Sequence, residues 1–267
     1  MQSIETILGS LQTSKKAIDV KWIFKLKLKP NGEVEKHKAR LVERGFMQKV
    51  GLDYSEVYAL VARLKTVRLI VVIACRRNWP MYHLDVKYAF LNGPLVEIMY
   101  VTQPPGFKIK GKEDMVYILH KNLYGLKRAP REMNKMIDSF LVQQEFVKCR
   151  YEYGVYLKKG MAGNQILISL YVDDLIVTSS NMNEIKAFKD QMMKEFEMTD
   201  LGKLTYFLGM EFTVIHDSLV MHQMKYASDI LKRFNMVSCN PASSASEVNS
   251  KLVINEDEEL VDPTLFK

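Results

Sequence analysis

Apolar and polar residues alternate in several short stretches of the chain, and this alternation predicts β-strands. In residues 21–29, KWIFKLKLK, nearly every second residue is apolar and most of the others are lysines. A period of two is typical of a strand with one apolar face and one basic face. Residues 30–32, PNG, predict a turn. We therefore expect residues 33–44 to return as the second strand of a β-hairpin.

The second strand of this hairpin carries a row of cations, namely Lys36, Lys38, Arg40 and Arg44. Lysine and arginine both bind phosphates, and arginine can do so with two parallel hydrogen bonds. The hairpin is therefore either a phosphate-binding flap or an ordinary solvated surface.

Apolar residues spaced three and four apart predict helices in other parts of the chain. The stretch 64–76 is apolar on nearly all sides from Leu69 onward, so we expect a buried helix there. Further helices are expected at 130–144, 183–197 and 223–235, and further strands at 81–86, 115–120, 151–158, 165–177, 204–214 and 219–222. Because the strands and helices follow one another without a regular βαβ rhythm, the pattern predicts an α+β fold.

The stretch QILISLYVDDLIVTSS, residues 165–180, has two apolar runs separated by Asp173 and Asp174. We interpret it as strand, tight turn, strand, with both acids in the turn. A two-residue hairpin turn usually contains Asn-Gly or Asp-Gly, because its central residues take positive φ. Adjacent carboxylates suit a hard divalent cation. An acidic surface turn explains the same dipeptide, because Asp is a common turn residue.

Composition narrows the class of partner. The chain has 267 residues, 48% of them hydrophobic, and a net charge of +7. This length allows one large or two small domains, and the charge favours a polyanion, with nucleic acid ahead of an anionic membrane surface. Cys75, Cys149 and Cys239 lie far apart, which favours reduced thiols over a disulfide framework.

The two ends of the chain show little regular spacing of apolar and polar residues. Residues 1–19 predict a short helix or tail without a secretory signal, and residues 239–267 predict a polar linker or tail. The longest apolar run is far shorter than the roughly 20 residues of a membrane span. We therefore expect a soluble, intracellular protein with no membrane partner.

A third acid completes a candidate site. Asp85 ends the strand predicted at 81–86, and neighbouring strands lie about 5 Å apart. If that strand adjoins the strands around Asp173 and Asp174, all three carboxylates can bind the same cations. A pair of divalent ions held in this way can clamp an in-line phosphoryl displacement.

Several long motifs occur together with this constellation, in one order along the chain. They are KARLVERGF (38–46), LDVKYAFLNG (84–93), QPPGF (103–107), LYGLKRAP (123–130), YVDDLIVTSS (171–180), DLGKLTYFLGME (200–211) and KYASDILKRFNM (225–236). On these motifs the chain resembles the reverse transcriptase of copia-type long-terminal-repeat retrotransposons over about residues 21–239.

The resemblance implies a right-hand polymerase fold, with fingers, a palm whose sheet carries the catalytic aspartates, and a partial thumb. On it, residues 1–20 are a tail and 239–267 a linker. The fingers take residues 21–80 and 94–120, the palm 81–93 and 121–214, and the start of the thumb 215–238.

The resemblance also implies an activity, namely RNA-directed DNA synthesis by nucleotidyl transfer from a deoxynucleoside triphosphate (dNTP) to a primer 3′-hydroxyl, on an RNA or DNA template. The implied cofactor is Mg²⁺, with Mn²⁺ as an alternative.

The resemblance also implies residue roles. Asp85, Asp173 and Asp174 would be catalytic and hold the metal, with the Val86 carbonyl as a further ligand. The implied dNTP-binding residues are Lys38, Arg40, Phe90, Gly125 and Lys127. The implied template and primer residues are Arg128, Pro130, Tyr171, Phe207, Leu208, Gly209 and Met210.

The chain departs from the family pattern at several positions. Arg128 stands where the family usually has Gln, Met133-Asn134 where it has Trp-Tyr, and Thr199 where a Lys often precedes Asp-Leu-Gly; Lys203 is a possible replacement for that Lys. The RNase H and integrase domains of the polyprotein are absent from this chain, so we expect a fragment of a retroelement. Two alternatives therefore stay open: an inactive remnant that only binds nucleic acid, and a palm-type enzyme that performs another two-metal nucleotidyl transfer.

Overall fold

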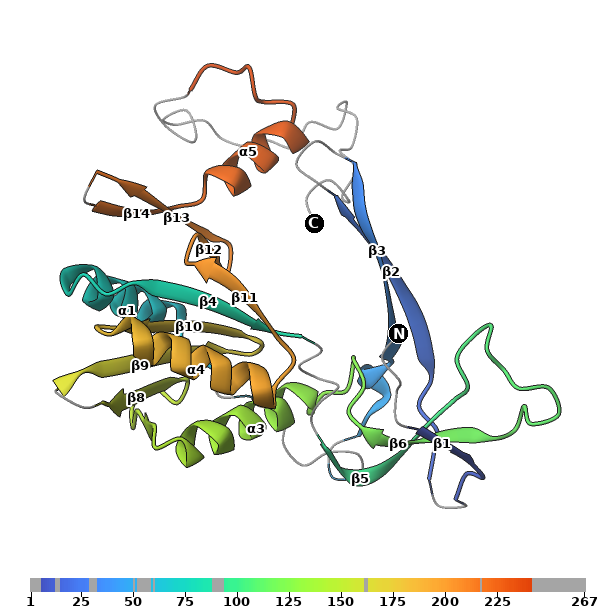
Figure 1. Ribbon diagram of the computed structural model, residues 1–267. Coiled ribbons are helices and arrows are strands. Elements are labelled where there is room, and N and C mark those ends of the chain that lie inside the picture. The colour runs from blue at the N-terminus through green and yellow to red at the C-terminus, as the bar shows by residue number, and fades with distance from the viewer. Residues whose placement is uncertain are drawn as a thin grey trace. The chain divides into compact units, whose positions relative to one another are not determined.

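A six-stranded antiparallel sheet carries the acids singled out above, and its strand order is β11-β4-β10-β9-β8-β7. The computed structural model in Figure 1 describes residues 6–12, 15–28, 33–49, 51, 59, 61–87, 94–160, 163–216 and 218–241. The strands of this sheet are β4 (Met81–Val86), β7 (Val147–Lys148), β8 (Val155–Lys159), β9 (Gln165–Tyr171), β10 (Asp174–Ser179) and β11 (Met198–Lys203). The mixture of helices and strands predicted from the pattern is confirmed.

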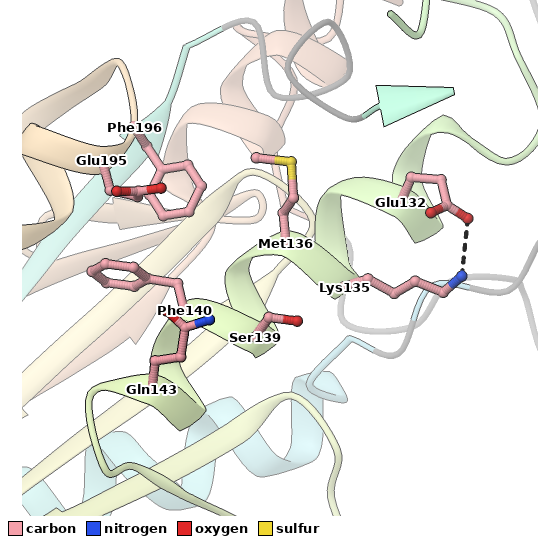
Figure 2. Close-up of a pocket in the computed structure, with 8 residues that line it drawn as sticks. All are labelled: Glu132, Lys135, Met136, Ser139, Phe140, Gln143, Glu195 and Phe196. Carbon is pink, nitrogen blue, oxygen red and sulfur yellow. Dashed lines mark hydrogen bonds and ion pairs between the residues drawn. The ribbon is translucent and has the colours of Figure 1, made fainter. Parts of the chain in front are cut away.

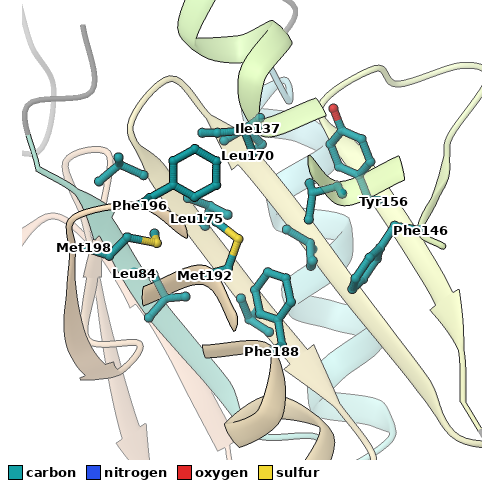
Figure 3. Close-up of a cluster of buried hydrophobic side chains, with 14 of the residues drawn as sticks. Leu84, Ile137, Phe146, Tyr156, Leu170, Leu175, Phe188, Met192, Phe196 and Met198 are labelled. Atoms are coloured by element: carbon teal, nitrogen blue, oxygen red, sulfur yellow. The ribbon is translucent and has the colours of Figure 1, made fainter. Parts of the chain in front are cut away.

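Helices α3 (Ala129–Gln143) and α4 (Met182–Glu195) cover one face of this sheet. Their apolar side chains pack on residues of β4, β9 and β10, as Figure 3 shows. The N-cap of α4 is Asn181, whose side chain accepts a hydrogen bond from the backbone N–H of Asn183 at 2.9 Å. The helix therefore begins one residue before the predicted start at 183, and it is capped by Asn181, whose backbone is extended.

Helix α1 (Leu64–Arg76) packs with the opposite side of the sheet. Its buried residues are Val67, Ile70, Val71 and Ala74. Leu69 and Val72 are 57% and 53% exposed, so the expectation of a helix buried on all sides is wrong. The apolar run contains more hydrophobic residues than one sheet face can cover.

The strands β12 (Tyr206–Phe207), β13 (Met210–Ile215) and β14 (Ser218–His222) form a small sheet. Side chains of this sheet share a core cluster with α1 and with Ile176 of β10. This cluster lies on the side of the large sheet that also carries Asp85 and Asp174.

The first described residues belong to a strand, so the expected helix or tail at residues 1–19 is wrong. β1 (Thr6–Gly9) pairs with β6 (Val116–Lys121), which also pairs with β5 (Pro94–Val101). Ile18 is 6% exposed and packs in the core of this region. A four-residue strand has no periodicity of its own, and it is stabilised here by pairing with β6.

The predicted basic hairpin is confirmed as a two-stranded ribbon of β2 (Val20–Leu28) and β3 (Val34–Glu43), joined to the short helix η1 (Gly45–Met47). Its predicted turn at 30–32 lies outside the described residues. On the apolar face, Phe24 and Leu26 are 75% and 59% exposed.

Residues 222–267 form a second compact unit, separate from residues 1–221. Its described part contains α5 (Met224–Arg233), none of whose residues is buried.

The three cysteines, Cys75, Cys149 and Cys239, are free thiols. Within the described part of the chain, no helix combines the length and apolar character that crossing a membrane requires.

Candidate active site

The β9–β10 hairpin does not place both acids in its turn, which corrects the expectation from the sequence. Tyr171 pairs with Asp174, so the central turn residues are Val172 and Asp173. Asp174 is the first residue of β10 and has a strand neighbour on each side. Compared with the apolar runs, β9 ends one residue earlier, at Tyr171, and β10 begins one residue earlier, at Asp174, so the turn is shifted by one residue.

Val172 has a φ of 57°, in the left-handed region. This conformation is an outlier for a β-branched residue, and such strain costs about 1–3 kcal/mol when the surroundings hold it. Here the backbone N–H of Val86 donates to the carbonyl of Asp173 at 2.8 Å. This bond fastens the strained turn to the end of β4.

Asp85 lies directly opposite Asp174 on the adjacent strand. On the other side of β4, Thr199 of β11 lies opposite Asp85. Residues that face each other across an antiparallel pair project to the same face of a sheet. The structure thus brings Asp85 and Asp174 together on one face, with Asp173 in the adjoining turn and Thr199 at the edge.

Burial and mutual repulsion both disfavour the charged forms of these acids. Burial raises the pKa of Asp85 and the Asp174 carboxylate raises it further, whereas His83, Lys38 and Lys87 act to lower it. The pKa of Asp173 is also raised, chiefly by burial, with contributions from Asp174 and Asp85 that Arg40 partly offsets. The carboxylates therefore interact with one another and with the cations of β3.

His83 is a part of this site that the sequence reasoning missed. Its Nε2 lies 2.6 Å from Oδ1 of Asp174, and an N–H there donates to the carboxylate. The ring also packs edge-on against Phe207, with centroids 5.2 Å apart. The signal was available, because residues 83 and 85 of one strand must share a face.

The chemistry of these donors suits a divalent cation, since Mg²⁺ and Mn²⁺ prefer carboxylate and carbonyl oxygens. Among the described residues, however, no three His, Cys, Asp or Glu side chains are gathered closely enough to hold a metal ion. The acids fit the implied metal by chemical type and by register, without forming a closed ligand cluster.

The cations Lys38 and Arg40 project from the same face of β3, because they lie two residues apart. Lys38 is exposed, and the Arg40 guanidinium lies 5.4 Å from the centre of the Tyr124 ring. Phe90, the third predicted dNTP-binding residue, lies outside the described residues.

The loop that holds Gly125 and Lys127 packs closely against the end of β3. Gly125 has a φ of 95°, and a Cβ added there would overlap the carbonyl oxygen of Glu43. The backbone N–H of Lys127 donates to Oε1 of Gln48 at 2.8 Å, and its Nζ donates to the Gln48 carbonyl at 3.2 Å. Glycine is therefore required by both the backbone conformation and the close approach.

The template and primer residues predicted in this loop and beyond differ in accessibility. Arg128 is 7% exposed and forms an ion pair of 3.1 Å with Glu132, and Pro130 lies in the first turn of α3. Tyr171 is partly exposed at the end of β9.

The predicted primer residues of the β12–β13 hairpin are mostly covered. Phe207 is fully buried and Met210 is 5% exposed, and the two residues pair across the hairpin. Leu208 and Gly209 form the turn, with φ values of 48° and 82°. Phe207 thus contacts His83 from inside the core.

A hollow of about 240 Å³ lies between α3 and the end of α4. Figure 2 shows Met136, Phe140 and Phe196 at its apolar side, with Glu132 and Lys135 joined by an ion pair nearby. These helices cover the face of the sheet opposite Asp85 and Asp174, so the hollow is separate from the acidic site.

Comparison with known proteins gives one consistent family. The family model described as "Reverse transcriptase (RNA-dependent DNA polymerase)" matches residues 6–247. The Retrovirus-related Pol polyprotein from transposon TNT 1-94 of Nicotiana tabacum is 38% identical over 247 residues, which is 92% of this chain and 19% of that protein. The corresponding polyprotein from transposon RE2 of Arabidopsis thaliana is 34% identical over 251 residues, or 94% and 17% of the two chains.

This chain therefore spans less than a fifth of each of these polyproteins. Among solved structures, a foamy viral protease-reverse transcriptase in complex with double-stranded DNA is similar at 15% identity with a TM-score of 0.42. The match covers 84% of this chain and 33% of that one. This structural similarity is too low to support an argument.

Proposed function

Because this chain belongs to the reverse transcriptase family of copia-type retrotransposon Pol polyproteins, we propose that it is an RNA-directed DNA polymerase core. Its substrates are a primed RNA or DNA template and dNTPs, and the primer 3′-hydroxyl attacks the α-phosphate. One observation carries this proposal: Asp85 and Asp174 face each other on adjacent strands, and Asp173 lies in a turn fastened to the same strand as Asp85.

We assign Asp85, Asp173 and Asp174, with the Val86 carbonyl, to binding Mg²⁺ or Mn²⁺. When bound, such ions stabilise the attacking and leaving oxygens of an in-line displacement. The assignment is supported by the oxygen donors and by the burial and mutual repulsion that raise the pKa of Asp85 and Asp173. A cation bound among these carboxylates relieves that repulsion.

We assign Lys38 and Arg40 to the triphosphate, with Phe90, Gly125 and Lys127 as further dNTP-binding residues. Support comes from the electrostatic interaction of Lys38 with Asp85 and of Arg40 with Asp173. Cations this close to the acids can neutralise phosphate oxygens next to the site of transfer.

In this proposal the chain is the fingers, palm and partial thumb of a right-hand polymerase, with the six-stranded sheet as the palm. Arg128, Pro130 and Tyr171 position the template. The hairpin of Phe207, Leu208, Gly209 and Met210 supports the primer. Because Arg128, Phe207 and Met210 are buried, their contribution is to hold the loop and hairpin in place.

Primer extension tests the proposal directly. On poly(rA)/oligo(dT) with Mg²⁺ or Mn²⁺, the chain should add deoxythymidine, and Asp173→Asn should abolish the addition. Asp190→Asn is a matched control, since Asp190 is an exposed carboxylate on α4. Extension that persists in Asp173→Asn would rule out the assigned site.

A second candidate function is nucleic-acid binding without catalysis. It is favoured by the lack of a closed metal-ligand cluster among the described residues. In that case the wild-type chain incorporates no nucleotide with either metal, and Asp85→Asn binds a primer–template duplex as tightly as wild type.

A further inference from the structure

We infer that His83 is a positioning residue for Asp174: it holds one carboxylate oxygen so that the other faces the metal position. The inference rests on the proposed function and adds to it a residue that none of the assigned roles includes. It also links the β12–β13 hairpin to the acidic site, since Phe207 packs edge-on against the imidazole.

The strand register brings His83 and Asp174 together. His83 lies opposite Ile176, and Asp85 lies opposite Asp174. His83 and Asp174 are therefore diagonal neighbours on one face of the sheet, a separation that a long or aromatic side chain can bridge. The imidazole spans this diagonal, with Nε2 2.6 Å from Oδ1.

Burial makes the interaction specific. The side chain of His83 is 11% exposed and that of Asp174 is 25% exposed. Hydrogen bonds to a carboxylate are shorter and stronger than neutral ones, and water competes little at this exposure. The contact therefore restricts rotation of the Asp174 carboxyl group about its last side-chain bond.

Phe207 packs against the imidazole. Its ring is fully buried and meets the His83 ring at an interplanar angle of 72°, the edge-on geometry that aromatic pairs prefer. Phe207 in turn packs in the cluster that contains Ile176 and Val67. The imidazole cannot swing away from Asp174 without disturbing this core.

The consequence for metal binding follows from the number of carboxylate oxygens. Because His83 holds Oδ1, Oδ2 of Asp174 would be the oxygen left to bind a cation shared with Asp85. Side chains that orient a metal ligand in this way typically change metal affinity 10–100-fold when they are removed. His83 should act by the same route, through Asp174 and without touching substrate.

Mn²⁺ binding tests the inference without relying on activity. The full chain, with a dideoxy-terminated primer–template and the matching dNTP, is titrated with Mn²⁺ while free Mn²⁺ is followed by electron paramagnetic resonance. His83→Leu should raise the dissociation constant by about 10–100-fold. His83→Gln, which keeps a side-chain N–H donor, should retain most of the affinity, and Ile176→Val controls for lost core packing.

The remaining outcomes separate this inference from the proposed function. Asp174→Asn binding Mn²⁺ as tightly as wild type would overturn the metal assignment itself. If Asp174→Asn loses affinity while His83→Leu does not, only the role of His83 is overturned. Equal losses in His83→Leu and His83→Gln would also overturn it, by assigning the effect to packing against Phe207. Should His83→Leu fail to fold, His83→Met takes its place, because its flexible side chain fills the same space.

Discussion

At the scale of single residues, the acidic site combines groups that destabilise one another. Asp85 and Asp173 are partly buried beside Asp174, and burial and repulsion raise the pKa of both. His83 holds Asp174, and the backbone hydrogen bond from Val86 to Asp173 holds the strained turn at Val172. Without a metal, the site therefore lowers the free energy of unfolding, and a bound cation offsets this loss.

This loss in the free energy of unfolding depends on pH. The pKa of Asp85 in the folded protein lies above its ordinary value of 3.8. At pH values between these two pKa values, the folded protein therefore binds more protons than the unfolded chain. The free energy of unfolding therefore falls as the pH rises from about the ordinary pKa through the folded pKa. Asp85→Asn removes the charge and should raise the melting temperature of the metal-free protein at pH 7 by roughly 1–3 °C.

Calorimetry in EDTA measures this change. The difference between Asp85→Asn and wild type should shrink as the pH is lowered toward 4. Asp190→Asn should have the same melting temperature as the wild type at both pH values, since the Asp190 carboxylate is exposed on α4. A lower melting temperature for Asp85→Asn at pH 7 would mean that the Asp85 carboxylate stabilises the fold.

At the scale of elements, the end of β3 and the loop at 122–130 are joined by backbone contacts. The N–H of Glu43 donates to the carbonyl of Tyr124 at 2.7 Å, and Val42 forms a parallel bridge with Tyr124. The close approach at Gly125 completes this junction. The cations of β3 and the residues of the loop are therefore positioned together.

Gly125→Ala should disturb this junction. The variant combines positive φ with overlap at the Glu43 carbonyl, and we expect a loss of about 1–3 kcal/mol in the free energy of unfolding. Urea denaturation measures it, and Gly163→Ala is the matched control. Gly163 has a φ of 79°, but a Cβ added there meets nothing within 4 Å. Equal losses in both variants would assign the effect to backbone conformation alone.

Elements could be predicted from the sequence where their own residues carry a pattern, and could not where they depend on pairing with another element. The alternation of apolar and polar residues predicted the β2–β3 hairpin, because a strand with one apolar and one basic face shows a period of two in its own sequence. It failed at β1, where four residues depend on pairing with β6. At the site, the motifs indicated Asp85 and the Asp173–Asp174 pair. The contact of His83 with Asp174 required the register between β4 and β10, which no local pattern contains.

At the scale of the whole molecule, the net charge of +7 favours association with a polyanion. Binding that releases counterions weakens as salt is added, in proportion to the number of phosphates contacted. Lys38 and Arg40 are two of the cations that interact with the acidic site, so they should account for part of this dependence.

Lys38→Ala should lower the salt dependence of binding to a primer–template duplex. The slope of log K against log salt concentration should become shallower by about 1. Fluorescence anisotropy across a salt series measures the slope. Lys194→Ala, an exposed cation in the last turn of α4, should leave it unchanged. An identical slope in Lys38→Ala and wild type would remove Lys38 from the phosphate-contacting surface.

The short strand β1 has a practical consequence for anyone producing this protein. β1 covers the outer edge of β6 through four paired residues, and an uncovered edge is a template for intermolecular strand pairing. A shortened version that starts after Gly9 would expose the backbone of β6 to a second molecule. Such a version should self-associate during purification, so recombinant forms need to retain the residues ahead of the basic hairpin.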